Sequence, residues 1–477
     1  MNILVDYTIV YTYLVVVFAF AFGLSRALKN NEISRNIIHI FAGLGWLVFK
    51  VLFPATIHPI IISASFVILT IITVAMKVNF IEREDGSYGT IYYTSVLLLM
   101  SIIGYNNLLF FDLFGLSIIC LALGDSGANI IGSKLGKKHI YKNKSLEGSI
   151  GCFVVCIITI LTFSKVFNLA LNIPAIIFLS LLCTITELYS GDFDNISIPF
   201  VMFIFSYILI TNGVNVLFIT SVVVGIIIAI IAYKLTLFTI PASFMLFYLA
   251  TVLIYFGGNK ALISIISVFA IIIVVEKILG KKTANITNTI NKESGKRNEL
   301  QLAANALFAI LSVVLWGMTK KEIFIITFFS AIAETFGDSI ASDVGILSKK
   351  EPIDICTFKR IERGLSGGVS LLGTTMALLI CLYSGIIYHL FYNGTLINVI
   401  IIVTSGLCGI LLDSILGSKI QAQYKCSICG KSTEKNVHCN TTTQLIKGKV
   451  FIDNTKVNLI CNIFSCVVAY VITSFVR

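Results

Sequence analysis

Long apolar runs separated by short polar segments dominate the chain. The runs at 9–22, 57–76, 216–232 and 261–275 are of the kind that crosses a bilayer as a helix, for which roughly 20 apolar residues are needed. A transmembrane β-barrel would instead alternate polar and apolar residues in segments of about ten, and these runs do not alternate. The pattern therefore predicts an all-α, polytopic membrane protein with roughly 14 to 16 spans.

Every group that could carry chemistry lies in or beside one of the polar segments between these runs. These segments lie at 26–36, 77–90, 132–148, 281–300, 343–365 and 419–456. We interpret 281–300 as a polar cytosolic loop with Lys296 and Arg297 near a site entrance; the simpler interpretation is a solvated connector.

Composition and charge narrow the class of protein. Of the 477 residues, 57% are apolar and 12% are charged, whereas soluble proteins carry roughly 25% charged residues. An ordinary soluble globule is excluded, and the lipid bilayer is an expected partner. The net charge of +11 comes from basic residues between the apolar runs, which is typical of cytosolic loops. Because these residues are not interleaved with aromatic ones, we expect small phosphorylated substrates and no nucleic acid.

A short internal repeat links the two halves of the chain. The frame G-D-S-x-A-x-x-x-G occurs at 124–132 and again at 337–345, each time at the end of an apolar run. Each copy is followed by a basic loop and then by a segment rich in Gly and Ser, at 144–149 and at 363–370, that could begin a helix.

A third correspondence, of Asp194-Asn195 with Asp413-Ser414, follows in the same order. Three ordered matches predict two related multi-helix units. Because the Asn/Gly-containing segment 211–215 is typical of a turn, we place one transmembrane domain at 1–212 and a second at 213–477, the latter with a cytosolic Cys/His loop at 419–456.

The first unit contains the parts of a phosphate-handling site. An ionised Asp in a span costs about 2.5–3.5 kcal/mol, so Asp125 needs a cation or a cavity. Mg²⁺ binds one or two carboxylates together with substrate phosphates, and Asp125, Asp194 and Asn195 could supply that set. Glu147 is a further candidate catalytic carboxylate. Candidate groups for phosphate are the basic loop and the helix start behind it: Lys134, Lys137, Lys144, Ser145 and Gly148. The alternative is a capped helix end, an ordinary cytosolic loop and a small-residue packing face.

These motifs give residues 1–212 a resemblance to the dolichol kinase and phytol kinase group of CTP-dependent polyprenol kinases. It rests on Arg35-Asn36-x-x-His39, GDSGANIIGSKLGKK, KSLEGS, Glu187, Asp192-Phe193-Asp194-Asn195 and Pro199. The resemblance implies phosphoryl transfer from CTP to a long isoprenoid alcohol, with Mg²⁺ at Asp125. His39 is a candidate base for the alcohol proton, or equally a packing residue. The family usually has Lys where this chain has Asn36.

The second half resembles the phytyl-phosphate kinase family, which phosphorylates a prenyl monophosphate. The resemblance rests on QLAAN at 301–305, GDSIASDVG, CTFKR at 356–360, GLSGGVSLLG and LDSILG at 412–417. Two positions depart from the family pattern: Asp343 stands for a more usual Glu, and Leu365 for a common Thr.

Carboxylates and basic groups in this half predict a second site. Asp338 and Asp343 are five residues apart, so they could share a Mg²⁺ site only around a helix end, and Asp413 would complete the metal shell. We expect the acceptor phosphate and the nucleotide to be held by basic and glycine residues of one segment: Lys359, Arg360, Arg363, Gly367 and Gly368. Arginine suits such planar phosphate contacts.

A Cys/His group lies in the last polar loop. The spacing of Cys426 and Cys429, followed by His438 and Cys439, is typical of zinc ligands. It predicts a structural Zn²⁺, the alternative being unmetallated cysteines in a loop ordered by other contacts.

The leading hypothesis is a bifunctional, multi-pass membrane kinase with active sites on the cytosolic side. It would convert a prenol such as phytol or geranylgeraniol to the monophosphate and then to the diphosphate, with CTP as nucleoside triphosphate and Mg²⁺ as cofactor. Two alternatives are a CTP-dependent lipid cytidylyltransferase, whose long C-terminal signature is not found here, and a transporter with internal repeats.

Overall fold

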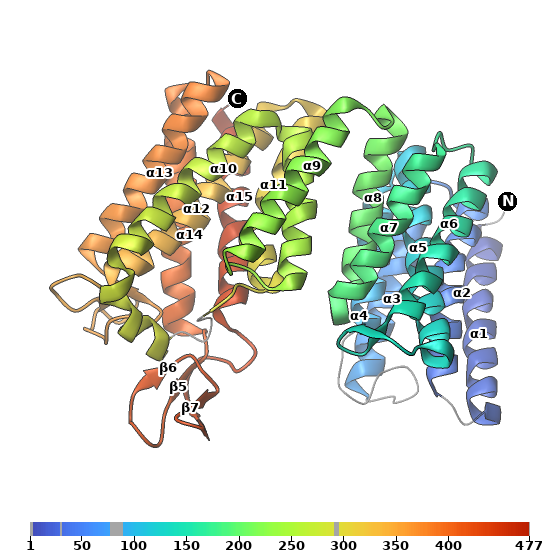
Figure 1. Ribbon diagram of the computed structural model, residues 1–477, viewed down its shortest axis with the longest axis horizontal. Coiled ribbons are helices and arrows are strands. Elements are labelled where there is room, and N and C mark those ends of the chain that lie inside the picture. The colour runs from blue at the N-terminus through green and yellow to red at the C-terminus, as the bar shows by residue number, and fades with distance from the viewer. Residues whose placement is uncertain (1–2, 29–30, 77–88, 291–294, 477) are drawn as a thin grey trace. The chain divides into compact units, whose positions relative to one another are not determined.

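The computed structural model describes residues 3–28, 31–76, 89–290 and 295–476 (Figure 1). Most of the polar segment 77–90, and residues 291–294 of the segment 281–300, lie outside these ranges. The chain divides into two compact units, Met1–Val216 and Leu217–Arg477. The division lies four residues after the boundary predicted at 212.

Unit 1 is a bundle of helices around α5 (Leu108–Leu135), which packs against five of the others. The remaining helices are α1 (Ile3–Leu28), α2 (Asn31–Leu52), α3 (His58–Ala75), α4 (Gly89–Ile103), α6 (Leu146–Val166), α7 (Ile173–Ser190) and α8 (Asp194–Asn212). Side chains that accept from a backbone N–H begin α5, α6 and α7: Asn107, Ser145 and Asn172. A two-stranded antiparallel hairpin, β1 (His139–Tyr141) and β2 (Lys144–Ser145), joins α5 to α6.

Unit 2 is a bundle around α12 (Glu322–Gly345). The other helices are α9 (Val216–Lys234), α10 (Ile240–Ile290), α11 (Glu299–Thr319), α13 (Leu371–Tyr392), α14 (Leu396–Lys419) and α15 (Asn454–Val476). The hairpin of β3 (Ile353–Asp354) and β4 (Gly368–Val369) joins α12 to α13. The segment between α14 and α15 holds the antiparallel sheet β6-β5-β9 and the hairpin β7-β8: β5 (Gln423–Lys425), β6 (Ser432–Thr433), β7 (Val437–His438), β8 (Thr441–Thr442) and β9 (Gln444–Lys447).

The protein is an integral, multi-pass helical membrane protein. The described residues contain 14 helices that are long and apolar enough to cross a bilayer, and α4 is a shorter apolar helix. This confirms the predicted fold class. One element differs from its prediction, because residues 281–290 continue α10 instead of forming a loop. Within α10, the positive φ of 67° at Gly258 interrupts the helical conformation.

The same arrangement of helix, hairpin and helix occurs in both units. In unit 1 a Cβ atom added to Gly148 would lie 2.9 Å from the carbonyl oxygen of Ala128, and in unit 2 a Cβ added to Gly373 would lie 2.8 Å from that of Ala341. The two helices therefore pack backbone against backbone at the same place in each unit, which only glycine permits. The repeat seen in the sequence is thus a structural repeat, with Ser145-Leu-Glu-Gly148 equivalent to Ser370-Leu-Leu-Gly373.

Candidate functional site

The first candidate site lies in unit 1, where α2, α5 and α8 meet. His39 of α2 lies between Asp125 of α5 and Asn195 of α8: its Nδ1 is 3.8 Å from Asp125 Oδ2, and its Nε2 is 3.0 Å from Asn195 Oδ1. The side chains of His39 and Asp125 are 17% and 16% exposed, so both are largely buried but still accessible to a small molecule. Asp194 precedes Asn195 and accepts a hydrogen bond from its backbone N–H at 2.7 Å. Four of the predicted residues therefore gather here.

The basic group at this site is Lys144, at the end of the hairpin. It forms an ion pair with Glu187 of α7, whose side chain is 1% exposed. Burial by itself would lower the pKa of Lys144, but the negative charges of Glu187, Asp125 and Asp194 outweigh it and raise the pKa above the usual value. A permanent positive charge therefore stands beside the carboxylates.

Other predicted residues of unit 1 lie around the hairpin. Ser145 begins α6 and accepts from the N–H of Gly148 at 3.1 Å. Lys134 and Lys137 are exposed. The carboxylate of Glu147 accepts from the backbone N–H groups of Lys137 and Lys138 at 3.1 and 3.3 Å. In this structure the carboxylate of Glu147 therefore holds the backbone just before β1 in position.

The second candidate site is a cavity of about 460 Å³ in unit 2. Three predicted carboxylates line it: Asp338 and Asp343 near the end of α12, and Asp413 in α14. Asp338 and Asp343 both lie in the last turns of α12, and both line the cavity, as the prediction of a shared site at a helix end expected. The Oδ2 atom of Asp413 is buried and has no hydrogen-bond partner among the described residues. Three carboxyl groups therefore line one cavity.

Basic residues and the glycine-rich segment also line this cavity. Arg297 and Arg363 line it together with Gly367 and Gly368. Arg363 also donates from Nη2 to the carbonyl of Lys349 at 3.0 Å. The remaining predicted phosphate ligands, Lys359 and Arg360, are exposed and do not belong to the cavity lining.

Four amides at the cavity were missed as site residues, one of which is Asn454 at the start of α15. Gln301 and Asn305 of α11 and Asn458 of α15 line it, and Asn458 Nδ2 donates to Asn305 Oδ1 at 3.4 Å. Gln301 and Asn305 belong to the QLAAN motif, and their spacing of four residues on one helix was an available signal. Nothing local in the sequence indicated Asn458.

The order of helices corrects the third predicted correspondence between the units. Helix α15 of unit 2 corresponds to α8 of unit 1, and an Asp-Asn pair stands at the start of each, Asp453-Asn454 and Asp194-Asn195. Asp413 instead lies on α14, which by order of helices corresponds to α7, the helix of Glu187.

Asp354 anchors the loop that carries the glycine-rich segment. Both of its carboxylate oxygens accept from Ser418 Oγ at 2.8 Å, and it also accepts from the backbone N–H groups of Cys356 and Thr357. Although burial opposes ionisation, these hydrogen bonds lower the pKa of Asp354 to about 2. The carboxylate is therefore ionised at neutral pH and ties the loop to the end of α14.

Gly367→Ala should destabilise unit 2 by roughly 1–3 kcal/mol, because alanine is strained at this backbone conformation. Gly367 has φ of +90°, and an added Cβ would lie 2.6 Å from the backbone nitrogen of Ser418. A lower melting temperature in detergent would reveal the loss. Gly368→Ala is the comparison variant and should destabilise less, since its φ lies outside the left-handed region and an added Cβ would meet the flexible end of Ile361 at 3.0 Å and the Leu365 carbonyl oxygen and Pro352 Cβ at 3.2 Å. Equal melting temperatures for the two variants would contradict the expectation.

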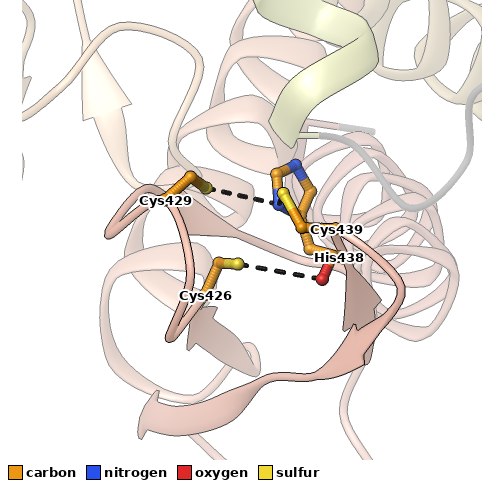
Figure 2. A group of neighbouring side chains, drawn as sticks. All are labelled: Cys426, Cys429, His438 and Cys439. Carbon is orange, nitrogen blue, oxygen red and sulfur yellow. Dashed lines mark hydrogen bonds between the residues drawn. The ribbon is translucent and has the colours of Figure 1, made fainter.

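The predicted Cys/His group also gathers in space. The ligand atoms of Cys426, Cys429, His438 and Cys439 all lie within 4.8 Å of one another. Figure 2 shows the four side chains grouped between two turns of the chain.

Both carboxylate sites have donors suited to Mg²⁺. Carboxylate and amide oxygens are the protein ligands that this ion prefers, with its other positions left to phosphate and water. Asp125, Asp194 and Asn195 supply them in unit 1, and Asp338 and Asp413, with its unpartnered buried oxygen, supply them in unit 2.

The fold and the two sites define an integral membrane protein built from two helical repeats, each with carboxylates beside a glycine-packed helix start. The chain belongs to the family described as "Integral membrane protein DUF92", which matches residues 223–466.

Relatives with names are similar over parts of the chain. Protein PGR of Arabidopsis thaliana is 31% identical over 194 residues, which cover 35% of this chain and 66% of that protein, just under two thirds of its length. The membrane protein MJ0933 of Methanocaldococcus jannaschii is 28% identical over 201 residues, or 41% of this chain and 77% of that one. Dolichol kinase sec59 of Schizosaccharomyces pombe is 34% identical over 90 residues, or 18% of each chain. No solved structure matches this protein.

Proposed function

We propose that this protein is a bifunctional membrane kinase that uses CTP and Mg²⁺. Unit 1 would phosphorylate an isoprenoid alcohol such as phytol or geranylgeraniol, and unit 2 would phosphorylate the resulting monophosphate to the diphosphate. The partial similarity to a dolichol kinase supports a kinase that acts on a membrane lipid. The division of labour rests on one difference between the two sites.

That difference is a histidine. Unit 1 has His39 beside its carboxylates, whereas the described residues that line the unit 2 cavity include amides such as Asn305 and no histidine. An alcohol must lose a proton when it attacks phosphorus, so its site needs a base. A phosphate monoester, whose second pKa is about 6, is already anionic at neutral pH. A histidine therefore suits a site that phosphorylates an alcohol. An asparagine is sufficient in a site that phosphorylates a monophosphate.

The hydrogen bond between His39 and Asn195 selects the tautomer that a base requires. Asn195 donates from Nδ2 to the carbonyl of Gly89 at 3.3 Å, so its Oδ1 faces His39 and accepts from Nε2–H. The neutral ring then carries its lone pair on Nδ1, a buried atom with no hydrogen-bond partner among the described residues. In the proposed step the alcohol proton moves to Nδ1 as the bond from the alcohol oxygen to the γ-phosphorus forms, and the bond to the departing CDP breaks.

The charged groups of each site would neutralise the phosphates. Mg²⁺, when bound by the carboxylates, supplies charge neutralisation for the transferring phosphoryl group. Lys144 and the N-terminus of α6 would hold donor phosphates in unit 1. Unit 2 offers Arg297 and Arg363, whose planar guanidinium groups suit an acceptor that already carries a phosphate.

The products formed from CTP test this proposal. Purified protein in detergent should convert labelled farnesol, geranylgeraniol or phytol to mono- and diphosphates, with one CDP released per phosphate transferred. Release of pyrophosphate would instead identify a cytidylyltransferase. If no prenol led to the release of CDP, the kinase proposal would be wrong and a transporter would become the better hypothesis.

A further inference from the structure

The segment 420–453, between α14 and α15, is folded although little apolar surface is buried in it. Its buried apolar side chains include Ala422 and Tyr424. Several large apolar side chains are exposed instead: Ile428, Val437, Leu445, Ile446, Val450 and Phe451. Segments of this size without a hydrophobic core usually need a covalent or metal cross-link to hold one structure.

The geometry of the Cys/His group matches the edges of a metal tetrahedron. His438 Nδ1 lies 3.4 Å from Cys429 Sγ and 3.3 Å from Cys439 Sγ (Figure 2). Zinc bonds of about 2.3 Å to sulfur and 2.0–2.1 Å to nitrogen place S and N ligands about 3.6 Å apart in a tetrahedron. The four ligand atoms therefore need only small shifts to enclose one ion.

Two tight turns present these ligands. In the first, the N–H of Gly430 donates to the carbonyl of Cys426, and the N–H of Cys426 donates to the carbonyl of Lys431, both at 3.0 Å. The second is the turn of the β7-β8 hairpin, where Cys439 and Asn440 have positive φ values of 51° and 58°. Non-glycine residues adopt this conformation when surrounding structure requires it, and here it places Cys439 beside the ring of His438.

We propose that Cys426, Cys429, His438 and Cys439 bind one Zn²⁺, and that this ion holds Glu434 at the cavity of unit 2. The site is structural, because four protein ligands leave no open position for water or substrate. The second part of the proposal rests on the proposed kinase function of that cavity.

Glu434 connects the metal site to the cavity. It lies in the chain between Cys429 and His438, so both of its flanks would be fixed by the ion. Its carboxylate accepts from Ser366 Oγ and, at 2.9 Å, from Gln421 Nε2. Ser366 belongs to the glycine-rich segment, and Glu434 and Ser366 both line the cavity. Loss of the ion would therefore release one wall of the proposed phosphate site.

Metal analysis of the full-length protein tests the first part. Protein purified in detergent without chelators should contain about one zinc per chain by inductively coupled plasma mass spectrometry. Cys429→Ser and Cys439→Ser should each lower this to near zero, whereas Cys466→Ser, on α15, should leave it unchanged. Wild-type protein without zinc, or variants that retain it, would overturn the site.

Separate assays of the two phosphorylation steps test the second part. Cys429→Ser should slow phosphorylation of supplied monophosphate by roughly 10–100-fold, the range known for groups that orient a metal or active site from outside it, and should leave alcohol phosphorylation unchanged. Glu434→Gln should slow the same step while the protein keeps its zinc. A zinc-free variant with a normal second step would overturn the coupling. If wild-type protein had zinc but no kinase activity, the proposed function would fail and the metal site would stand.

Discussion

Asp338→Asn should stop the second phosphorylation and make the monophosphate accumulate. The substitution keeps the size of the side chain but removes the charge of a carboxylate that lines the unit 2 cavity with Asp343 and Asp413. This carboxylate would hold the Mg²⁺ that neutralises the transferring phosphoryl group, and loss of such electrostatic stabilisation typically costs 100-fold or more, which is about 2.7 kcal/mol or more of barrier. The measurement is a two-step assay with labelled geranylgeraniol, in which the monophosphate and diphosphate are separated and counted.

Asp125→Asn is the reciprocal variant and the control. It should lose phosphorylation of the alcohol to a similar extent, because Asp125 lies beside His39 in unit 1. It should still convert supplied monophosphate to diphosphate. Each variant thereby shows that the other unit has folded. Equal loss of both steps in either variant would refute the assignment of one step to each unit.

His39→Asn should slow phosphorylation of the alcohol by roughly 10²- to 10⁴-fold, the usual contribution of a general base. The substitution gives unit 1 the type of residue found in unit 2, and it should leave phosphorylation of the monophosphate unchanged. In the wild type, protonation of the base should slow phosphorylation of the alcohol toward acidic pH. The residual alcohol activity of the variant should not show this decrease. Initial rates of both steps across pH 5 to 9 would measure this.

A second histidine provides the control for a purely structural effect. His58 lies in the same unit, where its Nδ1 is 3.0 Å from the hydroxyl of Tyr7, away from the carboxylates. His58→Asn should leave both steps and their pH dependence close to those of the wild type. If His39→Asn lowered the melting temperature but retained the wild-type pH profile, His39 would be a packing residue and not the base.

The sequence could predict the fold class, and it could predict several of the residues that lie together in each site. Both follow from local patterns in the sequence. Apolar runs indicate spans directly, and an Asp next to glycines in a span requires a polar environment. The gathering of His39, Asp125 and Asn195 followed from motifs that are far apart in the chain but are typical of one family. The Cys/His group was visible from its spacing alone.

The rest depended on tertiary structure. Residues 281–290 are polar, and this suggested a loop, but helix α10 continues through them. Glu187 and Lys144 are 43 positions apart and become partners only when α7 packs beside the hairpin. The N–H groups that engage Glu147 belong to the backbone, so no residue type could have indicated them. Asn458 could be assigned to the cavity only after α11 and α15 were known to be neighbours.

The glycine contact between helices has a consequence for how such proteins could diversify. At Gly148 and Gly373 the neighbouring helix is so near that neither position can accept any side chain. Where α6 and α13 begin, each site is therefore bounded by backbone atoms. Amino-acid substitutions can hardly change the shape of the site there. Adaptation to lipid tails of other lengths would have to occur farther along the same helices, where side chains can change in size without separating the two backbones.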